Sequence, residues 1–193
     1  MKYLLSCCFF LFFGAVAIAQ SYEGRLVYRE MVSGTERQVT LFVAPQQVLI
    51  KRGEEKALFY LIHATERGYS AWQAGASKAD QGTLKPSLKP AKMLPAKGQE
   101  QIISGFKAQP VRYELADGSI FEGWYTTDLP FQHNAFVNRL LGNEWGWLPA
   151  NGILLRWQLS NSKGGSLMAG ELVSHQAGKQ DPKLFAPPVT TDR

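Results

Sequence analysis

The sequence predicts a mainly β fold, a single domain built on a curved antiparallel sheet of about ten strands with one short helix. Three observations lead to this fold class. Apolar residues after position 21 recur mostly with a period of two. Gly, Pro, Asn, Asp and Ser separate the apolar runs at hairpin spacing, which favours antiparallel pairing. A twisted sheet of that size is expected to bend or partly close.

The first residues predict export. Lys2 precedes a nearly unbroken apolar run over 4–13, and Ala17-Ile18-Ala19 forms a small-x-small cleavage site before Gln20. We therefore expect a signal peptide over 1–19, cleavage after Ala19, and a periplasmic or secreted domain over 20–193. The alternative, a lipoprotein cleaved before Cys7 or Cys8, would leave only two leucines as the apolar part of the signal.

Composition limits the chemistry of the exported chain. Cleavage after Ala19 removes both cysteines, so no disulfide, zinc-thiolate site or cysteine nucleophile can form. It also lowers the formal net charge of +5 by one. No basic face with interleaved aromatic residues is present, which argues against a nucleic-acid partner. No later apolar run approaches the roughly 18 residues of a membrane span, so no transmembrane span is expected in the mature chain.

The predicted strands fall into two groups. The first group is expected over 22–32, 36–43, 47–52, 56–63 and 68–73, and the second over 101–106, 109–115, 119–127, 152–161 and 166–176. Asp117-Gly118 is the clearest hairpin turn, because both residues favour positive φ. The stretch 119–127 places aromatic residues on both of its faces, so both sides of that strand are expected to meet other groups.

Two stretches interrupt the strand pattern. The Pro/Lys-rich segment 84–97 contains three prolines, so it is expected to be a loop between the two strand groups. The segment 133–141 carries apolar residues at helical spacing and is followed by Gly142, which predicts the one short amphipathic helix. Neither side of the proline-rich loop is long enough for a separate core, so a single domain is expected.

No catalytic or metal-binding motif emerges from the sequence. His63, His133 and His175 have no partner at metal-ligand spacing. Glu114 and Glu122 could face each other across the Asp117-Gly118 turn, but acids on the wet face of a hairpin have the same pattern. We therefore expect no catalytic residue, no metal and no cofactor, and a protein that is not an enzyme.

Aromatic residues give the strongest unusual signal. The chain has five tryptophans, and Trp124-Tyr125 and Trp145-Gly146-Trp147 flank the predicted helix. Large aromatic residues in such number either fill an aromatic-rich sheet core or line an apolar pocket. If there is a pocket, the residues expected to line it and bind a ligand are Trp124, Phe136, Leu140, Trp145 and Trp147.

Two motifs suggest a family. Ile103-Ser104-Gly105-Phe106-Lys107 is followed by a strand containing Glu122-Gly123-Trp124-Tyr125-Thr126, and Leu184-Phe185-Ala186-Pro187-Pro188 closes the chain. This pattern resembles the exported bacterial domain of unknown function 4412, well over about thirty residues and loosely from Tyr22 to Pro188. That family is similar to the periplasmic carriers of lipoproteins and lipids (LolA/LppX-like), in which a curved antiparallel sheet wraps an apolar cavity. The resemblance implies a half-barrel of this carrier type and assigns no catalytic residue.

Two functions follow as hypotheses. The first is non-enzymatic binding or transport of a hydrophobic ligand, a lipid or an acylated protein, in the cell envelope. The alternative is an envelope module that docks a protein partner through a sheet edge or an aromatic surface.

Overall fold

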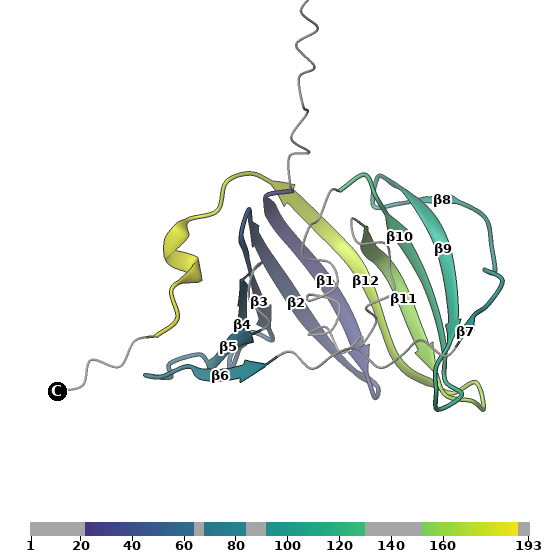
Figure 1. Ribbon diagram of the computed structural model, residues 1–193, viewed down its shortest axis with the longest axis horizontal. Coiled ribbons are helices and arrows are strands. Elements are labelled where there is room, and N and C mark those ends of the chain that lie inside the picture. Colours follow the sequence, from purple (N-terminus) through teal and green to yellow (C-terminus); the bar gives the residue numbers. More distant parts are fainter. Residues whose placement is uncertain (1–21, 64–67, 84–91, 130–151, 189–193) are drawn as a thin grey trace, which may run out of the picture.

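The computed structural model describes residues 22–63, 68–83, 92–129 and 152–188. These residues form twelve β-strands and one short 3-10 helix, η1, over Pro182–Phe185 (Figure 1). In chain order the strands are β1 Gly24–Val32, β2 Thr35–Ala44, β3 Gln47–Arg52, β4 Leu58–His63, β5 Gly68–Gln73, β6 Asp80–Thr83, β7 Lys92–Met93, β8 Gln101–Ile103, β9 Phe106–Glu114, β10 Ile120–Thr126, β11 Ile153–Ser160 and β12 Ser166–Ala177. The predicted fold class, a mainly β curved antiparallel sheet, is confirmed.

The strands make one sheet in which every pairing is antiparallel. Its order is β6-β5-β4-β3-β2-β1-β12-β11-β10-β9-β7, with β8 paired to β9 off this path. Strands β1 to β6 follow one another outward from the centre, and β12 to β9 do the same on the other side. The first strand therefore pairs with the last, β1 with β12, in the middle of the sheet (Figure 1).

All ten predicted strand segments contain strands, and the boundaries differ where a turn was misplaced. The segment expected over 101–106 is broken at Ser104 and Gly105, whose φ angles of 50° and 84° turn the chain between β8 and β9. The Ser104 hydroxyl donates a hydrogen bond of 2.9 Å to the carbonyl of Leu172 on β12 and so ties this turn to the sheet. The short edge strands β6 and β7 were not predicted, because four and two residues carry too little periodicity.

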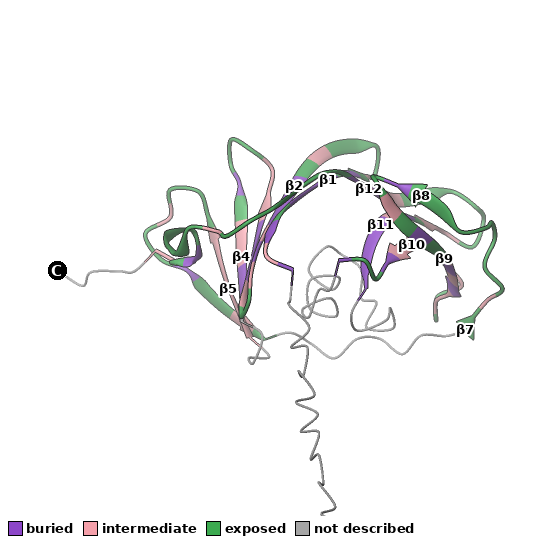
Figure 2. Ribbon diagram, turned by 90° about the horizontal axis from the view of Figure 1, so that it is seen from above, coloured by how far each residue is buried: buried purple, intermediate pink, exposed green. Residues whose placement is uncertain are grey.

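The strands are arranged as an arch (Figure 2). We call its concave side the inner face; register places Leu26, Leu41 and Ile50 there on three adjacent strands. All three are fully buried, as is Phe121 on the far half of the sheet. One large cluster of buried residues joins the two halves across this face. Period-two alternation explains this core, because every second side chain of each strand points to the same side.

A second, smaller core lies on the convex side, which we call the outer face. Leu49 on β3 and Leu61 on β4 are cross-strand partners there, and Phe185 of η1 packs on them. Phe185 is 6% exposed. The Asp181 carboxylate caps η1 by accepting a hydrogen bond of 2.9 Å from the backbone N–H of Lys183. The segment after the last strand is thereby held against the outer face of β3 and β4.

Several predicted features lie outside the described residues. These are the signal peptide over 1–19, the helix over 133–141 and the first part of the Pro/Lys-rich segment, 84–91. The rest of that segment contains the two-residue edge strand β7, followed by a backbone hydrogen bond of 2.9 Å from the N–H of Leu94 to the carbonyl of Arg112.

Candidate functional site

The centre of the inner face is built around Trp157 on β11. Its ring is 1% exposed and lies across Gly170 of β12, at the position where any larger residue would place its Cβ. Tyr28 on β1 packs beside it with ring centroids 5.6 Å apart, and the Tyr28 hydroxyl donates a hydrogen bond of 3.1 Å to the carbonyl of Leu154. Gly170 is thus the residue that lets this indole ring lie flat in the middle of the arch.

A charged cluster interrupts this apolar surface. Glu30 on β1 lies on the inner face in line with Leu26 and Tyr28, and like them it is buried, with 0% of its surface exposed. Its Oε2 atom accepts a hydrogen bond of 2.8 Å from Nε of Arg37, its cross-strand partner on β2, and forms an ion pair of 2.7 Å with Nη2 of the same residue. Its other oxygen, Oε1, is buried and has no hydrogen-bond partner among the residues that the structure describes. A buried carboxylate with one free oxygen is costly, so the cluster needs a physical explanation.

Arg52 on β3 is the third member of the cluster. Its guanidinium lies 5.5 Å from the ring centroid of Tyr60, its neighbour on β4, in a cation–π contact. Its Nε and Nη2 atoms are both buried, and neither has a hydrogen-bond partner within the described ranges. The described part of the chain therefore gives this arginine a stacking partner and an attractive charge in Glu30, but no acceptor for the N–H groups on one edge.

The pKa of Glu30 lies above its ordinary value. Burial raises this pKa most, and the charges of Arg52 and Arg37 together with the Arg37 hydrogen bond lower it. Burial likewise lowers the pKa of Arg52, which the charge of Glu30 opposes. Both directions have one cause, because an apolar sheet face solvates charge poorly.

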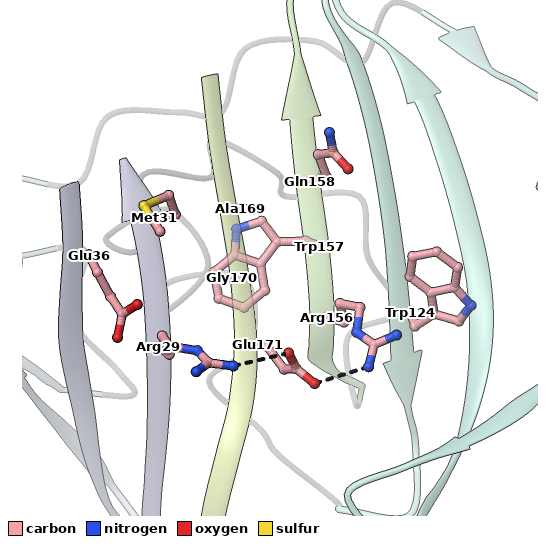
Figure 3. A pocket seen from close by; sticks show the side chains of 10 residues that line it. All are labelled: Arg29, Met31, Glu36, Trp124, Arg156, Trp157, Gln158, Ala169, Gly170 and Glu171. Atoms are coloured by element: carbon pink, nitrogen blue, oxygen red, sulfur yellow. Dashed lines mark hydrogen bonds and ion pairs between the residues drawn. The ribbon is translucent and has the colours of Figure 1, made fainter. Parts of the chain in front are cut away.

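The outer face carries a depression of about 390 Å³ across β1, β12, β11 and β10 (Figure 3). Glu171 at its centre forms an ion pair of 3.0 Å with Arg156 and one of 3.8 Å with Arg29. Trp124 flanks Arg156, its cross-strand partner, and Met31 lies on the opposite side (Figure 3). These charged side chains are partly exposed, so their ion pairs contribute little to stability.

The structure places one of the five predicted lining residues. Trp124 lines the depression on the outer face and also packs against the edge of the inner core. The other four lie outside the described residues: Phe136, Leu140, Trp145 and Trp147. Their positions relative to Trp124 therefore stay a prediction.

The candidate titratable groups are dispersed. Glu122 pairs with Arg112 at 2.9 Å, and Glu114 pairs in register with Ile120, so the two acids do not face each other. His175 packs against the ring of Phe106 with centroids 4.7 Å apart. Within the described ranges, no group of three or more His, Cys, Asp or Glu residues could hold a metal ion. The same part of the chain contains no helix of the length and apolarity that crossing a membrane requires.

Comparison with known proteins defines the fold and no more. No protein-family model matches the chain, and no curated protein matches it. The domain of unknown function 4412 is therefore not confirmed.

Solved structures are similar despite low identity. PNGF-II has a TM-score of 0.56 at 15% identity, over 86% of this chain and 30% of its own. A chain of the Pseudomonas aeruginosa MucA/MucB complex has a TM-score of 0.54 at 13% identity, over 84% of this chain and 54% of its own. An uncharacterized conserved protein from Thermus thermophilus has a TM-score of 0.53 at 11% identity, over 86% of this chain and 84% of its own. The chain thus spans about a third of PNGF-II and half of the matched chain of the complex. These likenesses support the curved, open antiparallel sheet expected from the sequence.

Sequence reasoning missed the charged cluster, although part of its signal was present. Period two places Glu30 on the same side as Leu26 and Tyr28 within an apolar strand. The Ser33-Gly34 turn sets a hairpin register that pairs Glu30 with Arg37. A polar residue in an apolar alternation, opposite a residue of opposite charge, could have been recognised as a buried ion pair.

Proposed function

We propose that this protein is a non-enzymatic binding protein of the bacterial cell envelope that holds an apolar ligand, the acyl chain of a lipid or of an acylated protein, against its inner face. The observation that carries the proposal is the buried apolar cluster of the inner face, which joins both halves of the arched sheet and is interrupted by the charged cluster of Glu30, Arg37 and Arg52. The predicted signal peptide is the basis for placing the protein in the cell envelope. Membership of the domain of unknown function 4412 remains part of this proposal and rests on the two sequence motifs.

The chemistry of the inner face supports an apolar ligand. Partly buried aromatic residues, among them Tyr60 and Tyr69 with ring centroids 6.0 Å apart, extend the buried cluster toward one end of the arch. Binding an acyl chain on such a surface is favourable by about 0.8 kcal/mol per buried CH₂ group. Binding of an acyl chain requires no reactive side chain of the protein.

The test is native mass spectrometry of the protein purified gently from its own envelope. A discrete additional mass of lipid size supports the proposal and gives the ligand class. The purified protein is then stripped of lipid and titrated with cis-parinaric acid, a fluorescent fatty acid. No additional mass together with no saturable fluorescence change would overturn the proposal.

Two variants localise the ligand. Tyr69→Asp puts a carboxylate on the partly exposed end of the inner face, and Met31→Asp puts the same group on the outer face, where Met31 is 40% exposed. We expect Tyr69→Asp to weaken binding of cis-parinaric acid about tenfold, equivalent to about 1.4 kcal/mol, because the acyl chain would desolvate the new charge. Met31→Asp should bind as the wild type does. Equal weakening by both variants would argue against an inner-face site.

A protein-docking module is the second candidate. It is favoured by the outer-face depression, where Trp124 and Met31 frame the Arg29–Glu171–Arg156 ion pairs. The similarity in fold to a chain of a two-protein complex adds support. Cross-linking in cells from a reactive group placed at Met31 should then capture one reproducible protein. Failure to capture any would remove this candidate.

A further inference from the structure

We infer that the tip of the β8–β9 hairpin, residues 101–108, is a flap that opens while the rest of the sheet stays paired, and that the hydrogen bond from Ser104 to Leu172 holds it closed. Opening of the flap gives access to the apolar cluster of the inner face, which is otherwise buried. This role in access rests on the proposed function, whereas the motion itself does not.

The sheet is not paired continuously beside the flap. Strands β11 and β12 pair from Ser160 with Ser166 to Arg156 with Glu171, and within the described ranges no pair follows beyond that point. Strand β12 nevertheless continues to Ala177. The ladder between these two strands therefore ends well before β12 does, and this end of the sheet lacks the backbone hydrogen bonds that join its other central strands.

The flap reaches β12 at this unpaired end. In the order of the sheet, β10 and β11 lie between β9 and β12. The Ser104 hydroxyl nevertheless donates a hydrogen bond of 2.9 Å to the carbonyl of Leu172 on β12, and the ring of Phe106 lies 4.7 Å from the ring of His175 on the same strand, between centroids. Side chains of the flap, and not a strand ladder, thus connect the two halves of the arch here.

Few contacts join the flap to its own half of the sheet. Strand β9 pairs with β10 from Gln109 to Glu114, whereas residues 106–108 pair only with β8 among the described strands. One exposed hydrogen bond of 3.1 Å runs from the backbone N–H of Lys107 to the carboxylate of Asp128. The flap can therefore separate from the sheet at Gln109 without breaking the pairing of β9 with β10.

The flap has one apolar side and one exposed side. Ile103 is 4% exposed and Ala108 is fully buried, and both belong to the large cluster on the inner face. Ile102, between them and the solvent, is 70% exposed. Burial of Ile103 and Ala108 keeps the flap closed most of the time, and opening exposes the cluster that they cover. Such local opening costs less free energy than unfolding, because the surrounding ladders stay intact.

The matched variants are Ser104→Ala and Ser33→Ala. Each serine precedes a glycine in a hairpin turn, and their φ angles are 50° and 49°, so alanine meets the same backbone strain at both positions. Within the described part of the chain, the Ser33 hydroxyl has no hydrogen-bond partner. Only Ser104→Ala therefore removes a side-chain bond to another strand.

Amide hydrogen exchange of the purified protein, followed residue by residue by NMR, measures the opening. In the wild type, the amides of residues 101–108 should exchange faster than those of residues 109–114. Ser104→Ala should speed exchange of residues 101–108 about fivefold, the factor expected for one net hydrogen bond. Ser33→Ala should leave it at the wild-type rate.

Three results would overturn the flap. The first is wild-type exchange of residues 101–108 that is as slow as that of residues 109–114, a comparison that needs no variant. The second is exchange that Ser104→Ala leaves unchanged. The third is exchange that Ser104→Ala speeds equally on β2, which would mean general destabilisation.

Stopped-flow mixing with cis-parinaric acid tests the role in access. A gate changes how fast a ligand enters and leaves but not how tightly it is held. Ser104→Ala should therefore raise the association and dissociation rate constants by the same factor and leave Kd unchanged, and Ser33→Ala should match the wild type. Unchanged rate constants in Ser104→Ala would overturn the role in access. Absence of binding by the wild type would overturn the proposed function and this role with it, while hydrogen exchange still decides whether the flap opens.

Discussion

Replacement of Gly170 by alanine tests the packing at the centre of the inner face. The Cβ atom of an alanine there would occupy the position of the Trp157 ring. The ring cannot simply swing outward, because Trp157 is 1% exposed and packs against Tyr28. The indole, the backbone of β12 or both must shift to admit one methyl group.

The expected cost follows from two opposing effects. Adding a methyl group to a filled core typically costs about 1–3 kcal/mol, because side chains leave their preferred rotamers. Replacing glycine by alanine also restricts the unfolded chain, which recovers about 0.4–1 kcal/mol. The net loss expected for Gly170→Ala is therefore about 1–2 kcal/mol in the free energy of unfolding. For a chain of this size each kcal/mol corresponds to about 2–4 °C in Tm.

Urea unfolding followed by circular dichroism measures this loss, and a double-mutant cycle identifies its cause. Trp157→Phe shortens the ring that occupies the contested space. If the clash is the cause, Gly170→Ala should cost less in the Trp157→Phe background, with a coupling energy of about 1 kcal/mol. Gly68→Ala is the comparison on an outer strand, since its Cβ would lie 3.3 Å from the carbonyl oxygen of Gly82 and should cost less. A neutral or stabilising Gly170→Ala, or a cost that is the same in both backgrounds, would refute the packing of Trp157 over Gly170.

Three further predictions concern the two cores and the charged cluster. Phe185→Ala should lower the free energy of unfolding by about 2–3 kcal/mol and expose the outer face of β3 and β4 to protease, because Phe185 fills the small outer cluster; unchanged unfolding and unchanged proteolysis would contradict this. Tyr28→Phe should cost about 1–2 kcal/mol in urea unfolding, because the buried carbonyl of Leu154 loses its hydroxyl donor; a gain in stability would contradict it. Burial raises the folded-state pKa of Glu30 above its ordinary value of 4.5, so the contribution of this residue to stability is fully present below pH 4.5 and is lost as pH rises through the folded pKa. The stability of the wild type relative to Glu30→Gln should therefore fall as pH rises through that range, and a difference that grows with pH would mean that Arg37 outweighs burial.

Local sequence pattern could have predicted only part of the charged cluster of Glu30, Arg37 and Arg52. Glu30 and Arg37 belong to one hairpin, so the position of its turn and the alternation of β1 are enough to pair them on the inner face. Arg52 is brought next to this pair by the register of β3 on β2, in which Arg52 is the cross-strand partner of Val39. Its unpaired guanidinium edge depends on the packing around it, which no local pattern encodes. The sequence could thus have predicted the ion pair, but not the free donors beside it.

Strands and turns were predictable because their signals are local. Alternation identifies a strand from its own residues. The turn at Asp117-Gly118 formed as expected: Gly118 has a φ of 79°, and the Asp117 carboxylate accepts a hydrogen bond of 2.9 Å from the N–H of Ser119. The misplaced boundary at Ser104 is the exception, since a non-glycine residue at a φ of 50° is held there by Leu172, a residue on another strand.

Alternation and turn residues were enough to predict the class of the fold and ten strand segments in chain order, but not the short edge strands β6 and β7. These properties follow from the chemistry of residues close together in the chain. Long-range packing accounts for the pairing of β1 with β12 at the centre of the arch, for the position of Trp157 over Gly170, and for the second core that Phe185 closes on the outer face. Strand neighbours far apart in the chain are selected by complementary packing of whole faces, and alternation is the same for every choice of neighbour.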